Sequence, residues 1–308
     1  MKSDSTVKPP LVFSGSAASL GFARFGIFAV WAVIVATTDV RGLAMLPDFL
    51  YSPTGILRIF GKGFAEHCTP GVMGAFQWLL CGWLVVLALG IRPYRWVAWG
   101  GVIGLLLFES WVKSYSSFIN HGQLGILYAA IGLALFPAGD AWVLFRFREV
   151  IPKKPSRYAS GMAFTAFVCA LAYAFVGIRR LALGPEVMWD DSLPRWVVSR
   201  TLEPMGYGFV WGLDVVRTSV LLWMLKVGFV VTTVFEVISP WVLFHDRLRR
   251  CWLAVMVPFH LLTLLTMNIF FWENLVLVMI YFTGISYVWV PRVHRALTGG
   301  QDLASAGP

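Results

Sequence analysis

The amino-acid sequence predicts an all-α, polytopic membrane protein with about eight transmembrane helices. The chain is 58% hydrophobic and 13% charged, and its mean hydropathy is +0.73. A water-soluble domain is close to half apolar and about a quarter charged, so this composition excludes a water-soluble fold. Because one transmembrane helix needs about 20 apolar residues, a chain of 308 residues holds about eight spans with short connections.

Apolar stretches long enough to cross a membrane recur along the chain, separated by loops with Pro, Gly and charged residues. The predicted spans are Leu20–Thr38, Gly71–Ile91, Trp96–Val112, Gly122–Pro137, Ser160–Ile178, Val220–Phe244, Trp252–Phe270 and Leu275–Val290. The first loop (Asp39–Pro70) and the fifth loop (Leu181–Ser219) are the longest, and we expect interfacial helices in both. Residues 1–16 then form a polar N-terminal tail, residues 17–292 the transmembrane domain and residues 293–308 a C-terminal tail. No cleavable signal peptide is expected, because the first apolar run is too long for one.

Lys and Arg are distributed unequally between the two sides of this topology. If both termini lie on one side, the loops of that side carry fourteen Lys and Arg, and the opposite loops carry nine. With carboxylates included, the first side accounts for the whole net charge of +9. The positive-inside rule therefore predicts that both termini are cytoplasmic, and we expect a bacterial inner membrane. The basic pI of about 9.6 is then an orientation signal, and no nucleic-acid partner is expected.

Several kinds of site have no support in the sequence. The four cysteines are Cys68, Cys81, Cys169 and Cys251. They form no CxxC motif, and no His or Cys pair has close metal-ligand spacing, so no metal site is predicted. Neither a glycine-rich phosphate motif nor a GxSxG motif occurs, so nucleotide binding and serine hydrolysis are not expected either.

Polar side chains gather at the outer ends of the middle spans in this topology. These residues are Glu109, Lys113, Asn120, His121, Arg179, Arg180 and Lys226. Glu109 and Lys113 are four residues apart, so on a helix they share a face and can pair. Ionisable groups inside a span are costly and usually face a bundle interior or a watered cavity, so we expect one cavity open to the outer leaflet. The alternative is that each residue caps a span at the interface, with Lys226 snorkelling outward.

His260 lies deeper than the other polar residues. It comes about eight residues into the seventh span, roughly 12 Å deep at 1.5 Å per residue. Pro258 just before it loosens the helical hydrogen-bond ladder, and Thr263 and Asn268 lead along roughly the same face toward Glu273. Such a histidine is either an interhelical hydrogen-bonding group or a functional residue, and the sequence leaves both roles open.

Short stretches along the chain resemble the horizontally transferred transmembrane (HTTM) domain, the group that includes the vitamin K-dependent γ-carboxylases. The stretches are Ala23–Phe25 with Tyr51–Gly55, Asn120–Leu124, Leu135–Gly139, Tyr173–Leu181, Phe235–Glu236 with Pro240, and Phe259–His260 with Asn268–Phe271. Each motif is loose by itself. Their order and spacing carry the resemblance, which extends from about residue 18 to about residue 290.

The resemblance implies a quinone-type ligand and specific roles for some residues. In the carboxylases the domain binds reduced vitamin K, a lysine acts as the base, and histidines assist the oxygenated intermediate. By position, His121 and His260 match those histidines and are the candidate catalytic residues, whereas Arg179 and Arg180 occupy the place of the lysine pair. Arginine stays protonated, so it can bind a quinone oxygen but cannot act as the base. The large extramembrane domain of the carboxylases is also missing after the last span, so peptide carboxylation is not expected, and whether the chain is an enzyme stays open.

Three functions follow from this interpretation. The protein is an enzyme of redox or maturation chemistry at the outer face, a non-enzymatic membrane subunit that scaffolds or matures a partner protein, or a carrier of a lipid or quinone. The expected ligand-binding residues are Glu109, Asn120, Arg179, Arg180, Lys226 and Asn268. Adjacent residues are about 100° apart on a helix, so only one of the two arginines is expected to point inward, and the resemblance favours Arg180.

Overall fold

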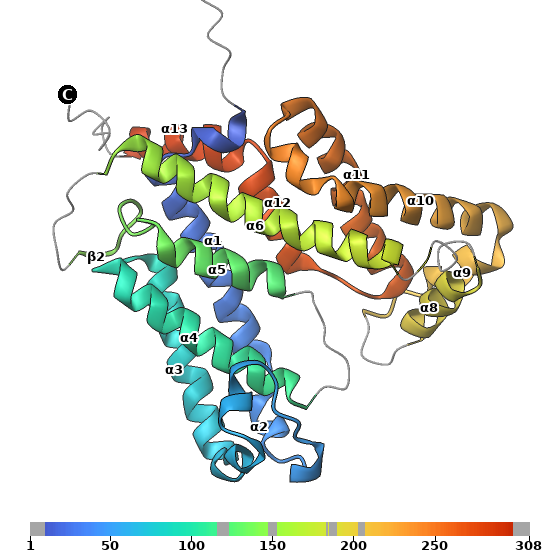
Figure 1. The fold of residues 1–308 in the computed structure, drawn as a ribbon, viewed down its shortest axis with the longest axis horizontal. Helices are drawn as coiled ribbons and strands as arrows, with labels where there is room; N and C mark the ends of the chain where they lie inside the picture. The colour runs from blue at the N-terminus through green and yellow to red at the C-terminus, as the bar shows by residue number, and fades with distance from the viewer. Residues whose placement is uncertain are drawn as a thin grey trace, which may run out of the picture. The chain divides into compact units, whose positions relative to one another are not determined.

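The computed structural model describes residues 10–115, 123–146, 153–182, 184, 190–202 and 207–297. Most of the two predicted tails, residues 1–9 and 298–308, lie outside the described residues. The chain divides into two compact units. Unit 1 comprises Met1–Ser14 and Ala166–Thr283, and unit 2 comprises Gly15–Thr165 and Gly284–Pro308. The described chain is predominantly helical (Figure 1).

Several helices have the length and apolar character of membrane spans. Those that meet both conditions are α1 (Ala17–Thr37), α3 (Pro70–Leu89), α6 (Pro155–Ala182), α10 (Ser219–Val237) and α11 (Asp246–Met267). The described residues thus contain 5 such helices, or 6 if Trp272–Phe282 and Ile285–Leu297 together form one broken span. The third and fourth predicted spans coincide with α4 (Tyr94–Lys113), which carries charged residues, and α5 (Leu124–Leu135), which has only 12 residues. This architecture agrees with the helical, multi-pass class predicted from the sequence, and the count of about eight spans stays a prediction.

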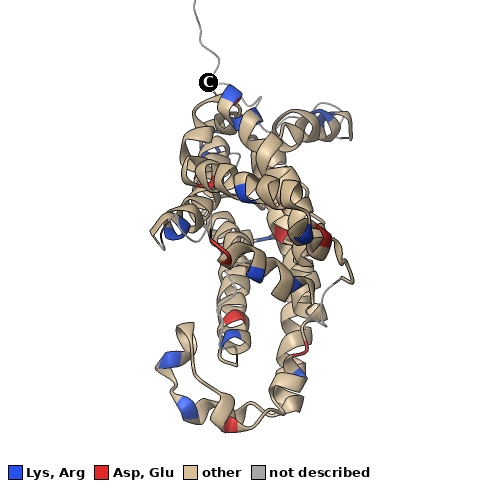
Figure 2. Cartoon of the chain, turned by 90° about the vertical axis from the view of Figure 1, so that its right-hand side faces the viewer, with Lys and Arg blue, Asp and Glu red and all other residues tan. Residues whose placement is uncertain are grey.

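The outer faces of these helices carry large apolar side chains. Leu79, Trp96 and Phe175 are 74%, 77% and 67% exposed. Figure 2 shows that most of the helical ribbon carries no charged residue. Water-soluble proteins rarely expose large contiguous apolar patches, so these faces are suited to contact with lipid.

In unit 2, α1 is the central helix. Ser16 and Ser19 form a capping box at its N-terminus. The helix packs against α3, α5, the π-helix η6 (Ile285–Trp289) and α13 (Val290–Leu297). The buried indole of Trp31 donates a hydrogen bond to the backbone oxygen of Ile126 at 3.2 Å. α4 completes this unit by packing against α3 and α5, and β1 (Ile91–Arg92) pairs in parallel with β2 (Phe145–Arg146).

The first loop contains several short elements where the sequence predicts an interfacial helix. They are α2 (Val40–Leu43) and the 3-10 helices η2 (Asp48–Leu50), η3 (Gly55–Ile59) and η4 (Lys62–His67). The turn predicted at Tyr51–Gly55 packs against the end of α4, where the Thr54 N–H donates to Ser114 Oγ at 3.0 Å. Gly55 has a φ of +53°, and a Cβ there would lie 2.4 Å from Ser110 Oγ, so the tight docking of this turn requires glycine.

Arg24 of α1 is fully buried in unit 2. Its guanidinium donates hydrogen bonds to the backbone oxygens of Ala138 at 3.0 Å, Ala141 at 3.3 Å and Ala88 at 3.4 Å, and also to that of Trp142. This side chain therefore ties the loop after α5 to α1 and to the end of α3. Buried charges need such a set of partners because their desolvation is costly.

In unit 1, α11 is the central helix. Around it pack α8 (Ser192–Thr201), α9 (Trp211–Arg217), α10, η5 (Ser239–Leu243) and α12 (Trp272–Phe282). The short 3-10 helix η1 (Leu11–Ser14) and the later part of α6 also belong to this unit. Leu193, Val197 and Met267 form a buried cluster between α8 and α11. The helices α8 and α9 occupy the fifth predicted loop.

Candidate functional site

The later part of α6 belongs to unit 1, and one of its faces lies against the other helices of this unit. Tyr173, Gly177 and Arg180 are spaced i, i+4 and i+7, so they share one side of the helix. The next residue back, Arg179, is exposed, whereas Arg180 is partly buried with its side chain 20% exposed. The two arginines therefore diverge as their helical positions require, and Arg180 is the one that points inward.

Gly177 lets α6 approach the end of α10 closely. A Cβ at this position would lie 2.9 Å from the Cβ of Glu236 and 2.9 Å from the backbone nitrogen of Val237. Contacts below 3.0 Å force a shift of the neighbouring atoms. The absence of a side chain here therefore brings Arg180, one turn further along, within reach of Glu236.

Arg180 is held by a carboxylate and two aromatic rings. Its Nη1 lies 2.5 Å from Oε2 of Glu236, whose side chain is 3% exposed. Its Cζ lies 4.7 Å from the ring centroid of Phe229 and 5.8 Å from that of Phe259. Both distances are within the range of cation–π attraction. The guanidinium is thus fixed in a defined position inside an otherwise apolar part of the unit.

An apolar pocket of about 400 Å³ opens beside Arg180. Its walls come from α8, α9, α10, α11 and the segment that follows α11, and they include Leu225, Phe229, Phe259, Leu262 and Ile269. The contributing positions recur at helical spacing, such as Leu225, Phe229 and Thr232 on α10. Among the described residues that line it, Arg180 alone is charged. Ligand pockets commonly combine such an apolar lining with a few fixed polar groups.

His260 is hydrogen-bonded to Tyr173. The Tyr173 hydroxyl lies 2.9 Å from His260 Nε2, and the histidine is 2% exposed. Its Nδ1 has no hydrogen-bond partner among the described residues. The pocket is lined by the neighbouring Pro258 and Phe259, and the described lining does not include His260 itself. The contact with Tyr173 is an interhelical hydrogen bond between α6 and α11, and the catalytic role of His260 stays a prediction.

Asn268 and Lys226 make contacts within the protein, and their predicted contact with a ligand stays a prediction. Asn268 ends α11 in the left-handed conformation, its Oδ1 accepts from the Phe209 N–H at 2.8 Å and its Nδ2 donates to the Thr201 backbone oxygen at 3.0 Å. Both ends of this amide are therefore used by the backbone. The pKa of the Asp190 carboxyl is lowered, first by its hydrogen bonds from Ser192. The positive charge of Lys226 nearby lowers this pKa further.

The other predicted site residues do not belong to the described part of unit 1. Glu109 lies in unit 2, where its Oε2 is 2.6 Å from the Lys113 ammonium, the pairing that their four-residue spacing predicts. Asn120 and His121 lie outside the described residues. A cavity shared by Glu109, His121, Arg180 and His260 therefore stays a prediction. Within the described ranges, no group of three or more His, Cys, Asp or Glu residues could hold a metal ion.

Sequence reasoning assigns no site role to Tyr173, Phe229 or Glu236. The spacing of Tyr173, Gly177 and Arg180 is visible in the sequence and could have indicated the functional face of α6. Glu236 is recognisable as an embedded acid, but the sequence does not show which cation pairs with it. Phe229 looks like any other apolar residue of a span.

The chain matches no protein-family model, no curated protein and no solved structure. What points to a function is therefore the pocket with its neighbours, together with the resemblance of the sequence motifs.

Proposed function

We propose that the protein is an HTTM-like integral membrane protein whose unit 1 pocket binds a lipid-soluble molecule with a polar acceptor group, such as a quinone. The observation that carries this proposal is the position of Arg180 on an apolar pocket of about 400 Å³. The lining suits an apolar ring or chain, and the guanidinium supplies hydrogen-bond donors for an oxygen. Arg180 anchors the head group without acting as a base, because arginine keeps its proton.

The ion pair with Glu236 shapes what Arg180 can bind. A guanidinium has five N–H donors in a fixed fork. One carboxylate oxygen cannot engage all of them. Glu236 holds the group in place, as do the rings of Phe229 and Phe259. Preorganisation of this kind lowers the entropy that a ligand must give up on binding.

Arg180 variants test the binding directly, with a short-chain ubiquinone as the probe and quenching of tryptophan fluorescence as the readout. Hydrogen bonds to charged groups contribute about 1.5–3 kcal/mol, so Arg180→Ala should weaken binding about tenfold or more. Arg180→Lys should retain most of the affinity, and Arg179→Ala is the matched control that should bind like the original protein. Gly228→Phe, which places a ring where a Cβ meets no atom within 4 Å, should block the pocket. Equal losses in Arg179→Ala and Arg180→Ala would contradict the proposal.

The proposal includes about eight spans, with interfacial helices in the first and fifth loops and both termini in the cytoplasm of a bacterium. The apolar helices and the excess of Lys and Arg in the terminal-side loops support it. Ser156, which is exposed at the start of α6, should then be reachable only from inside. In a Cys251→Ser background, Ser156→Cys should resist an impermeant maleimide applied to spheroplasts and react after lysis. Labelling before lysis would reverse the orientation.

A second candidate is an enzyme with redox or maturation chemistry. The hydrogen bond between Tyr173 and His260 favours it, because two titratable side chains meet in the same unit as the pocket. Turnover of a bound quinone by the purified protein would support the enzyme, whereas reversible exchange of the quinone without turnover would support a carrier. A partner protein that copurifies while the pocket stays empty would support the third function, a scaffolding or maturation subunit.

A further inference from the structure

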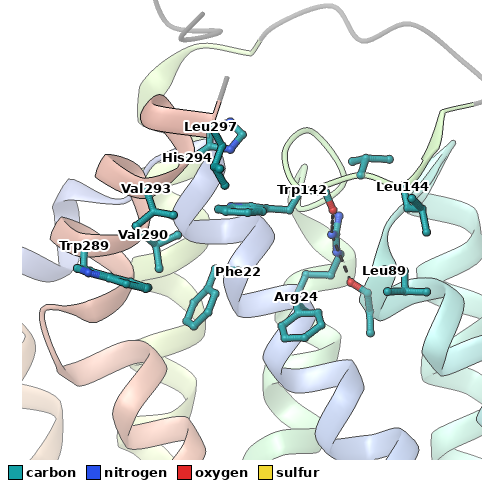
Figure 3. A pocket seen from close by; sticks show the side chains of 13 residues that line it. Phe22, Arg24, Leu89, Trp142, Leu144, Trp289, Val290, Val293, His294 and Leu297 are labelled. Atoms are coloured by element: carbon teal, nitrogen blue, oxygen red, sulfur yellow. Dashed lines mark hydrogen bonds between the residues drawn. The ribbon is translucent and has the colours of Figure 1, made fainter. Parts of the chain in front are cut away.

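Unit 2 contains a second pocket of about 670 Å³ that the proposed function does not use. Figure 3 shows it between α1, the end of α3, the loop at residues 142–144 and α13. Most of the lining is apolar, including Phe22, Leu89, Leu144, Val293 and Leu297. All of these residues belong to unit 2, so this pocket stands independently of the site beside Arg180.

Arg24 builds one wall of this pocket by fixing the loop that carries Trp142. Its guanidinium donates to the backbone oxygens of Ala138, Ala141 and Trp142. Trp142 has a φ of +55°, a left-handed conformation that is rare for a residue with a side chain. Its indole extends toward α13 (Figure 3) and packs against His294, with ring centroids 5.0 Å apart. The hydrogen bonds of Arg24 thus hold Trp142 in a conformation that places its ring in the pocket.

The opposite wall is the apolar face of α13. Val290, Val293 and Leu297 are spaced i, i+3 and i+7 and all line the pocket. Arg292 and Arg295 occupy the other face of this helix, and neither lines the pocket. The helix is therefore amphipathic, with its apolar side on the pocket and its basic side turned away.

The ionisable residues that line this pocket in the described part of the chain are all basic. Its ionisable described lining residues, Arg24 and His294, are both bases, and the described lining contains no carboxylate. The Nε of the fully buried Arg24 and the Nε1 of Trp142 have no hydrogen-bond partner among the described residues. Both groups are donors. An occupant that carries negative charge complements the basic lining residues, Arg24 and His294.

We propose that this pocket binds an anionic phospholipid, with one acyl chain along the apolar walls and the phosphate at the end where His294 lies. Two observations point to a lipid. The lining is apolar over most of its length, and the tryptophans Trp142 and Trp289 belong to it, a residue type that is enriched at membrane interfaces. In the predicted orientation this end of unit 2 faces the cytoplasmic leaflet, where anionic lipids are abundant.

Lipid retention by the delipidated full-length protein tests the proposal. Phosphatidylglycerol and phosphatidylcholine with identical chains are added in detergent, and bound lipid is counted by native mass spectrometry, with inorganic phosphate as a separate sample. Phosphatidylglycerol should be retained about fivefold better, as expected for one favourable basic side chain. Phosphate alone should not bind.

Two leucine variants separate this pocket from the general lipid surface. Leu144 lines the pocket and is 65% exposed, and Leu79 of α3 is 74% exposed and lies outside its described lining. Leu144→Trp should lower the retention of phosphatidylglycerol, and Leu79→Trp should leave it unchanged. His294→Gln should keep the chain bound but reduce the preference for phosphatidylglycerol, which provides a test even if Leu144→Trp does not fold. Equal retention in the two tryptophan variants, equal retention of the two lipids, or binding of phosphate alone would each overturn the proposal.

Discussion

Replacing Arg24 with alanine should destabilise the protein severely, because four backbone oxygens in unit 2 lose their hydrogen-bond donor. The side chain is fully buried and donates to four backbone oxygens, those of Ala88, Ala138, Ala141 and Trp142. Each buried acceptor that loses its donor costs about 1–3 kcal/mol, and the total stability of a protein is only about 5–15 kcal/mol. Arg24→Ala is therefore expected to yield little folded protein, with the unfolding midpoint of the remainder lowered by about 10 °C or more.

Thermal unfolding followed by size-exclusion chromatography in one detergent measures this effect. Arg24→Lys keeps the charge but has three donors on one nitrogen, so it should fall between the alanine variant and the original protein. Arg157→Ala removes an exposed arginine at the start of α6 and should change the midpoint little. If Arg24→Ala unfolded at the temperature of Arg157→Ala, the loop after α5 would not depend on this side chain.

The second large effect should come from separating Arg180 and Glu236. Removing one member of a buried ion pair costs about 3–5 kcal/mol, because the other charge remains without its partner. Glu236 is 3% exposed and Arg180 is 20% exposed, with two aromatic rings against its guanidinium. Arg180→Ala leaves the more deeply buried charge behind, so it should lower the unfolding midpoint more than Glu236→Gln does.

The double variant Arg180→Ala/Glu236→Gln gives the sharper result. Because it removes both charges, it should be more stable than Arg180→Ala alone, a strong departure from additivity. It also separates stability from binding, since a folded protein without Arg180 should still bind the quinone weakly. Additive losses in the unfolding midpoint would mean that the two side chains do not interact.

The sequence predicts the helices well because their signal is local. Long apolar runs identify the 5 or 6 helices that have the length and apolar character of spans, and the four-residue spacing of Glu109 and Lys113 identifies their ion pair. The role of Arg24 could not be predicted, since its acceptors are backbone oxygens up to 118 residues away that leave no trace in side-chain identity. The short helices of the first loop could not be predicted for a related reason. These short elements are held by contacts with α3 and α4, such as the burial of Leu57 and the hydrogen bond of Thr54 with Ser114.

The candidate site is predictable from the sequence only in part. The resemblance favours Arg180 over Arg179, and the structure shows Arg180 at an apolar pocket and Arg179 exposed. Its partner Glu236 is 56 residues away, and the approach that joins them depends on Gly177. Such a contact is set by the packing of α6 on α10, which helical periodicity does not specify. Asn268 lies at the end of α11, where its amide is hydrogen-bonded to the backbone, and its predicted contact with a ligand stays a prediction.

Photo-crosslinking with a photoreactive short-chain quinone tests the central claim most directly. The protein in lipid nanodiscs is irradiated with the probe, and the labelled peptides are identified by mass spectrometry. We predict labels on α10 and α11 around Phe229, Phe259 and Leu262, which line the pocket beside Arg180. Excess unlabelled quinone and the Gly228→Phe substitution should both remove them. Labels that persist in Gly228→Phe, or that fall only on unit 2, would contradict the assignment of a ligand to this pocket.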